Sequence, residues 1–219
     1  MEKYKREIIN RLEKIAEKYS MYEVFSDWIK CSALAMSNAC DMNRGKIWDD
    51  REKEYIVTMQ RYTEKERKLF VEMLSLLTMS LEEHLEDVLG WIYMASGMGS
   101  KAAGQFFTPY HLSELVAEMS LPEPEEDGKY RIYEPSCGGG GMIIAAVAAL
   151  KKRGVNYQRN VEVVAQDLDW KGVYMCYLQL GLLGVKATCV QGDTLIEPYS
   201  SIYPKARVLR TPAEMGALP

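Results

Sequence analysis

Four consecutive glycines, Gly138 to Gly141, directly follow a short strand-like segment, and they constrain the fold more than any other feature of the chain. Residues 129–133 have the pattern of a strand, and Glu134 stands at its end, just before the glycines. Glycine adopts backbone conformations that other residues avoid, and it lets a ligand approach the backbone closely. A strand that leads through such a turn into a helix is typical of α/β domains that bind a nucleotide or nucleoside cofactor.

Strand and helix patterns alternate after this point of the chain. Three segments are predicted strands and two are predicted helices: 129–134, 160–167 and 187–191 for the strands, and 142–153 and 171–183 for the helices. Alternation of this kind predicts a sheet of parallel strands with right-handed crossovers. Residues 206–210 are predicted to add a short fourth strand.

The first hundred residues have a different character, because their patterns are almost wholly helical. Apolar residues recur at helical spacing in residues 6–15, and Thr63-Glu64-Lys65-Glu66 has the capping-box pattern that opens a helix. Residues 80–93 predict the last amphipathic helix of this part. We therefore predict an all-α N-terminal module at residues 1–100 and an α/β domain at residues 101–219.

Composition narrows the classes of protein that the chain can belong to. With 47% hydrophobic and 26% charged residues it has the composition of an ordinary soluble globular protein. The longest apolar run, Met142 to Leu150, is far shorter than the roughly 20 residues that cross a membrane, and the charged N-terminus leads into no signal-peptide core. We therefore expect a cytoplasmic protein without membrane contact. The net charge of −4 argues against a chain that binds nucleic acid by itself, because binding to phosphates usually requires an excess of basic residues.

The cysteines predict neither a disulfide framework nor a metal site. They are odd in number, they form no Cys-x-x-Cys pair, and His84 and His111 are the only histidines that could join them as ligands: Cys31, Cys40, Cys137, Cys176 and Cys189. We expect buried thiols and no bound metal.

Acidic residues stand at the ends of the three predicted strands. Glu134 closes the first strand, Asp167 closes the second, and Asp193 follows the third. In an open parallel sheet, ligands bind outside the carboxyl ends of the strands, so these three carboxylates are expected to converge on one molecule.

A second motif, Gly104-Gln105-Phe106-Phe107-Thr108-Pro109, lies just before the predicted sheet. Together with the glycine turn and the acidic strand ends, it resembles the adenine-specific (N6) DNA methyltransferases of the type I restriction-modification methylation subunit group. The resemblance covers roughly residues 60 to 195. It implies a Rossmann-like sheet that is typical of S-adenosylmethionine-dependent methyltransferases, with S-adenosylmethionine as the cofactor.

The resemblance also implies roles for individual residues. Phe106, Thr108 and Pro109 match the segment that packs on the methionine end of the cofactor, and Glu134 matches the acid near its ammonium group. Gly138 and Gly140 match the turn on which the cofactor lies. Asp167 would contact the ribose hydroxyls, and Asp193 the adenine amine. Leu168 or Trp170 would cover the face of the adenine ring. Pro135, Cys137 and Thr194 are assigned to the same pocket.

The chain departs from the family at the catalytic motif. Adenine methylation requires a flipped base that is stacked on an aromatic ring and held at its amine by a side-chain amide, and the family supplies these groups with Asn/Asp-Pro-Pro-Tyr/Phe. This tetrapeptide occurs nowhere in the sequence. After the predicted fourth strand, its place is taken by Thr211, Pro212, Ala213 and Glu214, and neither a hydroxyl nor a carboxylate can replace the amide and the ring. We therefore predict no catalytic residue here, and a methyltransferase domain that is incomplete at its C-terminus.

Three functional hypotheses follow from these patterns. The first is an S-adenosylmethionine-dependent adenine DNA methyltransferase of a restriction-modification system, which binds the cofactor and needs a partner or a missing segment for catalysis. Its expected partners are DNA, reached through a partner subunit, and a specificity subunit or second methyltransferase subunit. The second is a catalytically inactive, cofactor-binding regulatory or assembly module derived from such an enzyme. The third, a dinucleotide-dependent oxidoreductase, is disfavoured because four adjacent glycines do not have the Gly-x-Gly-x-x-Gly spacing.

Overall fold

The computed structural model describes residues 2–99, 107–121, 123–200 and 202–217 of the chain. Phe106, one of the predicted site residues, lies outside these ranges. The N-terminal part of the described chain is helical throughout, and its helices are α1 (Glu2–Ile15), α2 (Met21–Cys40), α3 (Lys46–Met59), α4 (Glu64–Glu83) and α5 (Val88–Ala95).

The second part of the chain alternates between helices and strands. Its elements are α6 (Tyr110–Ser120), β1 (Tyr130–Glu134), α7 (Gly141–Lys152), α8 (Tyr157–Asn160), β2 (Val161–Asp167), α9 (Trp170–Leu182), β3 (Lys186–Gln191), the 3-10 turn η1 (Lys205–Arg207) and β4 (Val208–Arg210). The α/β fold class, a Rossmann-like methyltransferase sheet preceded by helices, is confirmed.

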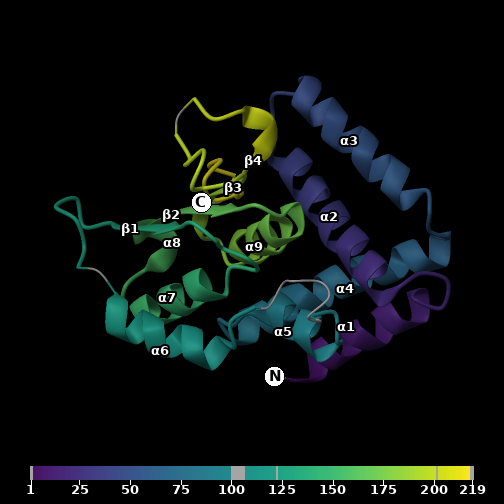
Figure 1. Ribbon diagram of the computed structural model, residues 1–219, viewed down its shortest axis with the longest axis horizontal. Helices are drawn as coiled ribbons and strands as arrows, with labels where there is room; N and C mark the ends of the chain where they lie inside the picture. Colours follow the sequence, from purple (N-terminus) through teal and green to yellow (C-terminus); the bar gives the residue numbers. More distant parts are fainter. Residues whose placement is uncertain (1, 100–106, 122, 201, 218–219) are drawn as a thin grey trace.

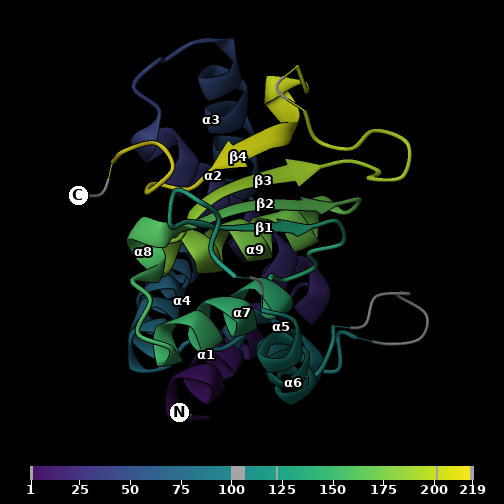
Figure 2. The ribbon, with the colours of Figure 1, turned by 90° about the vertical axis from the view of Figure 1, so that its left-hand side faces the viewer.

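The strands form one sheet in the order β1-β2-β3-β4 (Figure 2). The pairs β1–β2 and β2–β3 are parallel, whereas β4 pairs with β3 in the antiparallel direction. The prediction of parallel strands is therefore wrong for the fourth strand. A parallel neighbour needs a crossover, usually a helix, but the described residues between β3 and β4 contain only the turn η1, and the chain returns along β3 in the opposite direction.

The helix predicted over residues 80–93 is also wrong in one respect, because it is interrupted. Helix α4 ends at Glu83, and α5 begins only at Val88. The side chain of Asp87 accepts a hydrogen bond from the backbone N–H of Gly90, and this cap starts a new helix. The break leaves the carbonyl of Leu85 free to accept a hydrogen bond from the hydroxyl of Tyr110 on α6.

One hydrophobic core joins the two parts of the chain. Helix α9 is buried along almost its whole length, and it packs against β2 and β3 on one side and against α2 on the other. Figure 1 shows α7 and α9 beneath the sheet, with α1, α4 and α5 farther from it. A single cluster of buried side chains includes Trp28 of α2, Leu77 of α4, Met175 of α9 and Cys189 of β3. The predicted division at residue 100 stays a prediction, and the core is continuous across it.

The turn between β1 and α7 has the backbone that its glycines predict. Gly138 has a φ of 48° and Gly140 a φ of 90°, and both values lie in the left-handed region that favours glycine. Gly140 is also the N-cap residue of α7. A Cβ atom at Gly140 would lie 3.1 Å from Sγ of Cys176 and 3.4 Å from Cα of the same residue, so the turn lies directly against α9.

The capping box of α4 gives a first test of the fold. The Thr63 hydroxyl accepts a hydrogen bond from the backbone N–H of Glu66, and the Glu66 carboxylate accepts one from the N–H of Thr63. We expect Thr63→Ala to lower the free energy of unfolding by about 1 kcal/mol, measured by urea denaturation. The control is Ser75→Ala, which removes an exposed hydroxyl from the middle of the same helix and is expected to change little.

The same box predicts a dependence on pH. The hydrogen bond from the Thr63 backbone lowers the pKa of Glu66, so the carboxylate contributes its stabilisation above the ordinary glutamate pKa and loses it as the pH falls through the lowered value. The difference in the free energy of unfolding between the wild type and Glu66→Ala, which lacks the carboxylate, should therefore shrink in that acidic range. A difference that is the same at neutral and acidic pH would contradict the capping box.

The glycine turn gives a second test. We expect Gly140→Ala to lower the free energy of unfolding by at least ~2 kcal/mol, because a left-handed backbone and close packing on Cys176 both oppose a side chain. Gly128→Ala is the matched control: Gly128 also has a positive φ, of 76°, but a Cβ atom there meets nothing within 4 Å. It should cost only about 1 kcal/mol. Equal losses in the two variants would show that the packing of the turn on α9 is unimportant.

Candidate functional site

The three predicted carboxylates lie along one edge of the sheet. Glu134 ends β1 and Asp167 ends β2, and Asp167 pairs in register with Gln191 at the end of β3. The backbone N–H of Gly192 donates to the carbonyl of Asp167 at 2.8 Å, which brings Asp193 to the same edge. The structure thus places these strand ends side by side, where parallel sheets bind ligands.

Asp167 connects this edge to the glycine turn. One carboxylate oxygen accepts a hydrogen bond from the backbone N–H of Gly138 at 2.8 Å, and the other accepts from the N–H of Asp169 at 2.9 Å. The N–H of Cys137 also donates to the carbonyl of Gln166, the residue before Asp167. Each carboxylate oxygen has a further lone pair, so Asp167 can hold the turn and still accept hydrogen bonds from a ligand.

The loops that follow β1 and β3 contact each other directly. The hydroxyl of Thr194 donates to the carbonyl of Pro135 at 2.7 Å, and this bond fixes the two loops beside one another. Glu134 accepts a hydrogen bond from the backbone N–H of Ser136 through one of its oxygens, at 3.2 Å. Asp193 accepts from the N–H of Leu195 at 2.9 Å. Four of the predicted site residues therefore share one surface at the ends of β1 and β3.

Buried Gln166 supports this surface from within the sheet. Its side-chain amide donates to the carbonyl of Glu197, while its side-chain oxygen accepts from the N–H of Tyr199 and the hydroxyl of Tyr133. Sequence reasoning missed this residue. Its signal is a lone amide in the apolar strand 161–167, where a buried polar side chain needs partners.

The residues that follow β2 point in different directions. Leu168 is 67% exposed beside Asp167, which suits an apolar surface for a planar ring. The ring of Trp170 instead stacks on Tyr174, with centroids 5.0 Å apart. Both aromatic rings line a cavity of about 290 Å³ between α2, α3, α9 and β4. Of the two residues, Leu168 is the one that faces solvent at the strand ends.

The aromatic segment before α6 contacts the glycine turn through Phe107. A Cβ atom at Gly138 would lie 2.9 Å from the Phe107 ring, so the ring packs directly on the bare backbone of the turn. Phe107 also packs edge-on against Tyr93 of α5, with ring centroids 5.1 Å apart. Thr108 is exposed, and Pro109, also exposed, is the N-cap residue of α6. Sequence reasoning assigned the neighbours of Phe107 to the site but missed Phe107 itself.

Cys137 lies on the inner side of the turn. Its side chain is buried, and its thiol forms a hydrogen bond with the thiol of Cys176. Cys176 forms a second hydrogen bond with the thiol of Cys189, and all three cysteines are free. These hydrogen bonds and burial raise the pKa of Cys176 well above its ordinary value. Cys137 and Cys176 are therefore protonated packing groups beneath the turn, and buried Cys189 packs beside them.

Thr211 lies at the opposite end of the sheet from the three carboxylates. It is fully buried, its hydroxyl donates to the carbonyl of Val185 at 2.7 Å, and it accepts from the N–H of Ala187 at 2.9 Å. Both partners lie at the start of β3, because β4 runs antiparallel to it. The structure therefore does not bring Thr211, Pro212, Ala213 and Glu214 to the edge at which the predicted cofactor residues meet. Their alignment with the catalytic tetrapeptide finds no support in this arrangement.

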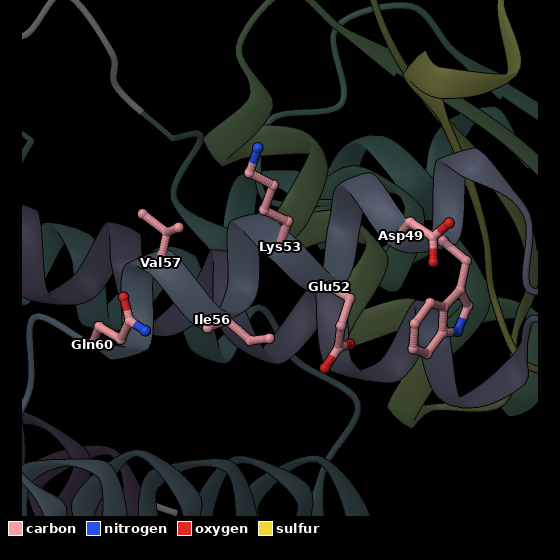
Figure 3. A pocket seen from close by; sticks show the side chains of 7 residues that line it. Asp49, Glu52, Lys53, Ile56, Val57 and Gln60 are labelled. Carbon is pink, nitrogen blue, oxygen red and sulfur yellow. The ribbon is translucent and has the colours of Figure 1, made fainter.

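A second hollow, of about 300 Å³, follows the outer side of α3. Figure 3 shows that its side chains come from α3 and the residue after it: Trp48, Asp49, Glu52, Lys53, Ile56, Val57 and Gln60. None of the strand ends reaches this hollow, and it is separate from the candidate site.

Two further properties concern only the described ranges of the chain. No three or more histidine, cysteine or acidic side chains lie together there in a way that would hold a metal ion. Likewise, none of the helices in these ranges combines the length and the apolar character needed to cross a bilayer.

Comparisons with known proteins agree with this geometry. The chain is 22% identical over 186 residues to the Type I restriction enzyme MpnII methylase subunit of Mycoplasma pneumoniae, an alignment that covers 80% of this chain and 33% of the relative. It is 26% identical over 121 residues to the Type I restriction enzyme MjaIX methylase subunit of Methanocaldococcus jannaschii, over 53% of this chain and 20% of that protein. The chain thus matches about a third or less of the length of these curated relatives.

The fold and the family are both supported. A structure from Listeria monocytogenes, named as a class I S-adenosylmethionine-dependent methyltransferase, superposes with a TM-score of 0.51 at 13% identity, over 89% of this chain and 55% of that one, and it shows the fold alone. The family model described as N-6 DNA Methylase matches residues 85–212, which is more than half of the chain and includes the glycine turn and all three carboxylates. The resemblance found in the sequence is confirmed, and the chain belongs to the N-6 DNA Methylase family.

Proposed function

We propose that this chain binds S-adenosylmethionine at the carboxyl ends of β1, β2 and β3, as the cofactor-binding part of an adenine-specific DNA methyltransferase in a restriction-modification system. The observation that carries the proposal is Asp167, whose carboxylate holds the glycine turn through the N–H of Gly138 and lies between Glu134 and Asp193 along the sheet edge. Family membership and the names of the relatives, methylase subunits of type I restriction enzymes, support the same function.

The residues present fit the chemistry of this cofactor. Asp167 lies beside the glycine turn and has lone pairs left for two ribose hydroxyls. In the proposal, Glu134 attracts the ammonium group, Asp193 accepts from the adenine amine, and Leu168 covers the adenine ring. The remaining contacts are assigned to Phe106, Thr108, Pro109, Pro135, Cys137, Gly140 and Thr194. Bound S-adenosylmethionine supplies an electrophilic methyl group on a sulfonium centre.

The groups that would orient the target base are proposed to come from outside these 219 residues. The sequence contains no Asn/Asp-Pro-Pro-Tyr/Phe, and Thr211 lies at the wrong end of the sheet for the role. A flipped adenine needs a stacking ring and an amide acceptor for its amine before the methyl group can reach its nitrogen. Because the net charge of −4 gives no electrostatic grip on DNA, we propose that a specificity subunit or second methyltransferase subunit brings the DNA.

The missing tetrapeptide also favours a second candidate function. In that alternative, the chain binds the cofactor without ever taking part in methyl transfer and acts as a regulatory or assembly module. The two functions share the cofactor site and differ only in whether a partner restores catalysis.

The cofactor site is tested by binding. We expect Asp167→Ala to weaken the binding of S-adenosylhomocysteine by roughly 10- to 100-fold in calorimetry, since it removes a charged acceptor of two hydrogen bonds. Asp167→Asn, which keeps one oxygen acceptor, should lose less. Asp127→Ala is the control, because Asp127 caps a turn near the other end of β1 and pairs with Arg131, away from the site. Equal affinity of the wild type and Asp167→Ala would contradict the proposed site, as would a wild type that fails to bind ligand at millimolar concentration.

The catalytic part of the proposal is tested by methyl transfer. We expect the isolated chain to bind labelled S-adenosylmethionine without methylating adenine-containing DNA, because the loss of the amide and the stacking ring removes several kcal/mol of transition-state stabilisation. Robust turnover by the isolated chain would contradict this expectation. Turnover that appears only when its partner subunits are added would favour the first function, and persistent inactivity in the assembled complex would favour the second.

A further inference from the structure

We propose that Asp87 and Gln179 are positioning residues that hold the glycine turn, Gly138 to Gly141, in its cofactor-binding conformation from the side opposite Asp167. Their role in affinity rests on the proposed function, whereas their hold on the turn does not. Asp87 precedes α5 and Gln179 lies on α9, so the pair connects the helical part of the chain with the cofactor site.

Gln179 uses both ends of its side-chain amide in this contact. It is fully buried, and its nitrogen donates to the carbonyl of Gly139 and to a carboxylate oxygen of Asp87, each at 2.8 Å. Its oxygen accepts from the backbone N–H of Leu89 at 3.0 Å. A flipped amide would set its oxygen against two acceptors and its nitrogen against a donor, so only one orientation satisfies the surroundings.

Asp87 has two partners in the same network. Its Oδ1 atom accepts from Gln179 and from the backbone N–H of Gly90, again at 2.8 Å. Burial raises the pKa of Asp87, and the two hydrogen bonds oppose that shift. The network therefore offsets part of the cost of placing a carboxylate in the core.

The spacing of the glycines points to Asp87 independently of the hydrogen bonds. Gly138 and Gly140 have positive φ values, but Gly139 and Gly141 do not. A Cβ atom at Gly141 would lie 3.0 Å from Oδ2 of Asp87. One at Gly139 would first meet Cε of Met175, at 3.1 Å, and would be in ordinary contact with Oδ1 of Asp87, at 3.5 Å. A Cβ atom at Gly90 would overlap the same carboxylate. The glycines of the run thus have different causes: Gly138 and Gly140 provide the conformation, Gly139 lies against Met175, and Gly141 leaves room for Asp87.

The turn is consequently fastened from two sides. Asp167 binds the N–H of Gly138 at the ligand face, and Gln179 binds the carbonyl of Gly139 from the core. Without Gln179, that carbonyl and the N–H of Leu89 would be left without these buried partners, and the peptide units of the turn would be free to reorient. A cofactor would then have to order the turn as it binds, which lowers its affinity.

The experiment compares variants of the whole chain by two readouts. The first is amide hydrogen exchange in residues 137–141 of the protein alone, and the second is the affinity for S-adenosylhomocysteine. Gln179→Met keeps the volume of the side chain and removes its hydrogen bonds. We expect it to speed exchange in the turn by about tenfold relative to β2, and to weaken the ligand by about tenfold, through the loss of hydrogen bonds that hold the turn.

Two substitutions at Asp87 separate the cap from the turn. Asp87→Asn keeps an oxygen that accepts from both Gly90 and Gln179. Hydrogen exchange in the turn should therefore stay slow in this variant, and its affinity for the ligand should stay near that of the wild type. Asp87→Ser still caps α5 but is too short to reach Gln179, so it should loosen the turn while α5 remains protected. Asp87→Ser also carries the test if Gln179→Met does not fold.

The control is Gln158→Met, which removes a hydrogen bond from the side-chain amide of Gln158 to the carbonyl of Leu183, at the other end of the sheet. It should lower stability without changing exchange in the turn. The proposal is overturned if Gln179→Met or Asp87→Ser exchanges like the wild type in residues 137–141, or if Gln158→Met loosens the turn equally. Failure of the wild type to bind the ligand would contradict the proposed function alone, because hydrogen exchange decides this inference without any ligand.

Discussion

The hydrogen bond between the carboxylate of Asp167 and the N–H of Gly138 is the contact on which the candidate site depends. It fixes the turn after β1 against the end of β2, and without it the left-handed glycines would have no partner at the ligand face. The same aspartate uses its carbonyl to accept from Gly192 and so brings in the loop after β3. One residue therefore ties three strand ends together by local bonds, and a ligand at this edge meets carboxylates from all three strands.

Most of the fold could be predicted because the hydrophobic periodicity and the turn-forming or helix-capping residues indicated the same element boundaries. Strands β1, β2 and β3 and helices α7 and α9 lie within a few residues of the segments predicted for them. The prediction failed at two elements. At one, a local polar contact determined where a helix began; at the other, pairing with a strand elsewhere in the chain determined the direction of a strand. The side chain of Asp87 caps α5 and so interrupts an apolar helical pattern. Hydrophobic periodicity does not indicate that a polar side chain will bond to the backbone in this way. The direction of β4 followed from the absence of a crossover helix after β3, which the short pattern at residues 206–210 does not reveal.

The residues of the candidate site that face the ligand could be predicted from the sequence, whereas those that support it from the core could not. Glu134, Asp167 and Asp193 could be found because each follows a strand, and the carboxyl ends of parallel strands meet at one edge. Asp87 and Gln179 are 92 residues apart in sequence, and no spacing rule brings such a pair together. The signal for Gln179 was a single amide in the apolar helix 170–182. The glycine run itself was interpreted only as a cofactor surface, although Gly141 makes room for the buried carboxylate of Asp87.

These contacts bear on where the cofactor-binding unit begins. Lys171 of α9 donates to the hydroxyls of Tyr22 on α2 and Tyr93 on α5, and the ring of Tyr93 packs on Phe107, which covers Gly138. The family match starts at residue 85, just before Asp87. Because α5 contributes a cap, a carboxylate and an aromatic ring to the back of the turn, it belongs physically with the site that follows it. We infer that the structural unit which forms the candidate site begins before α5, and that the earlier helices contact it through α5 and α9.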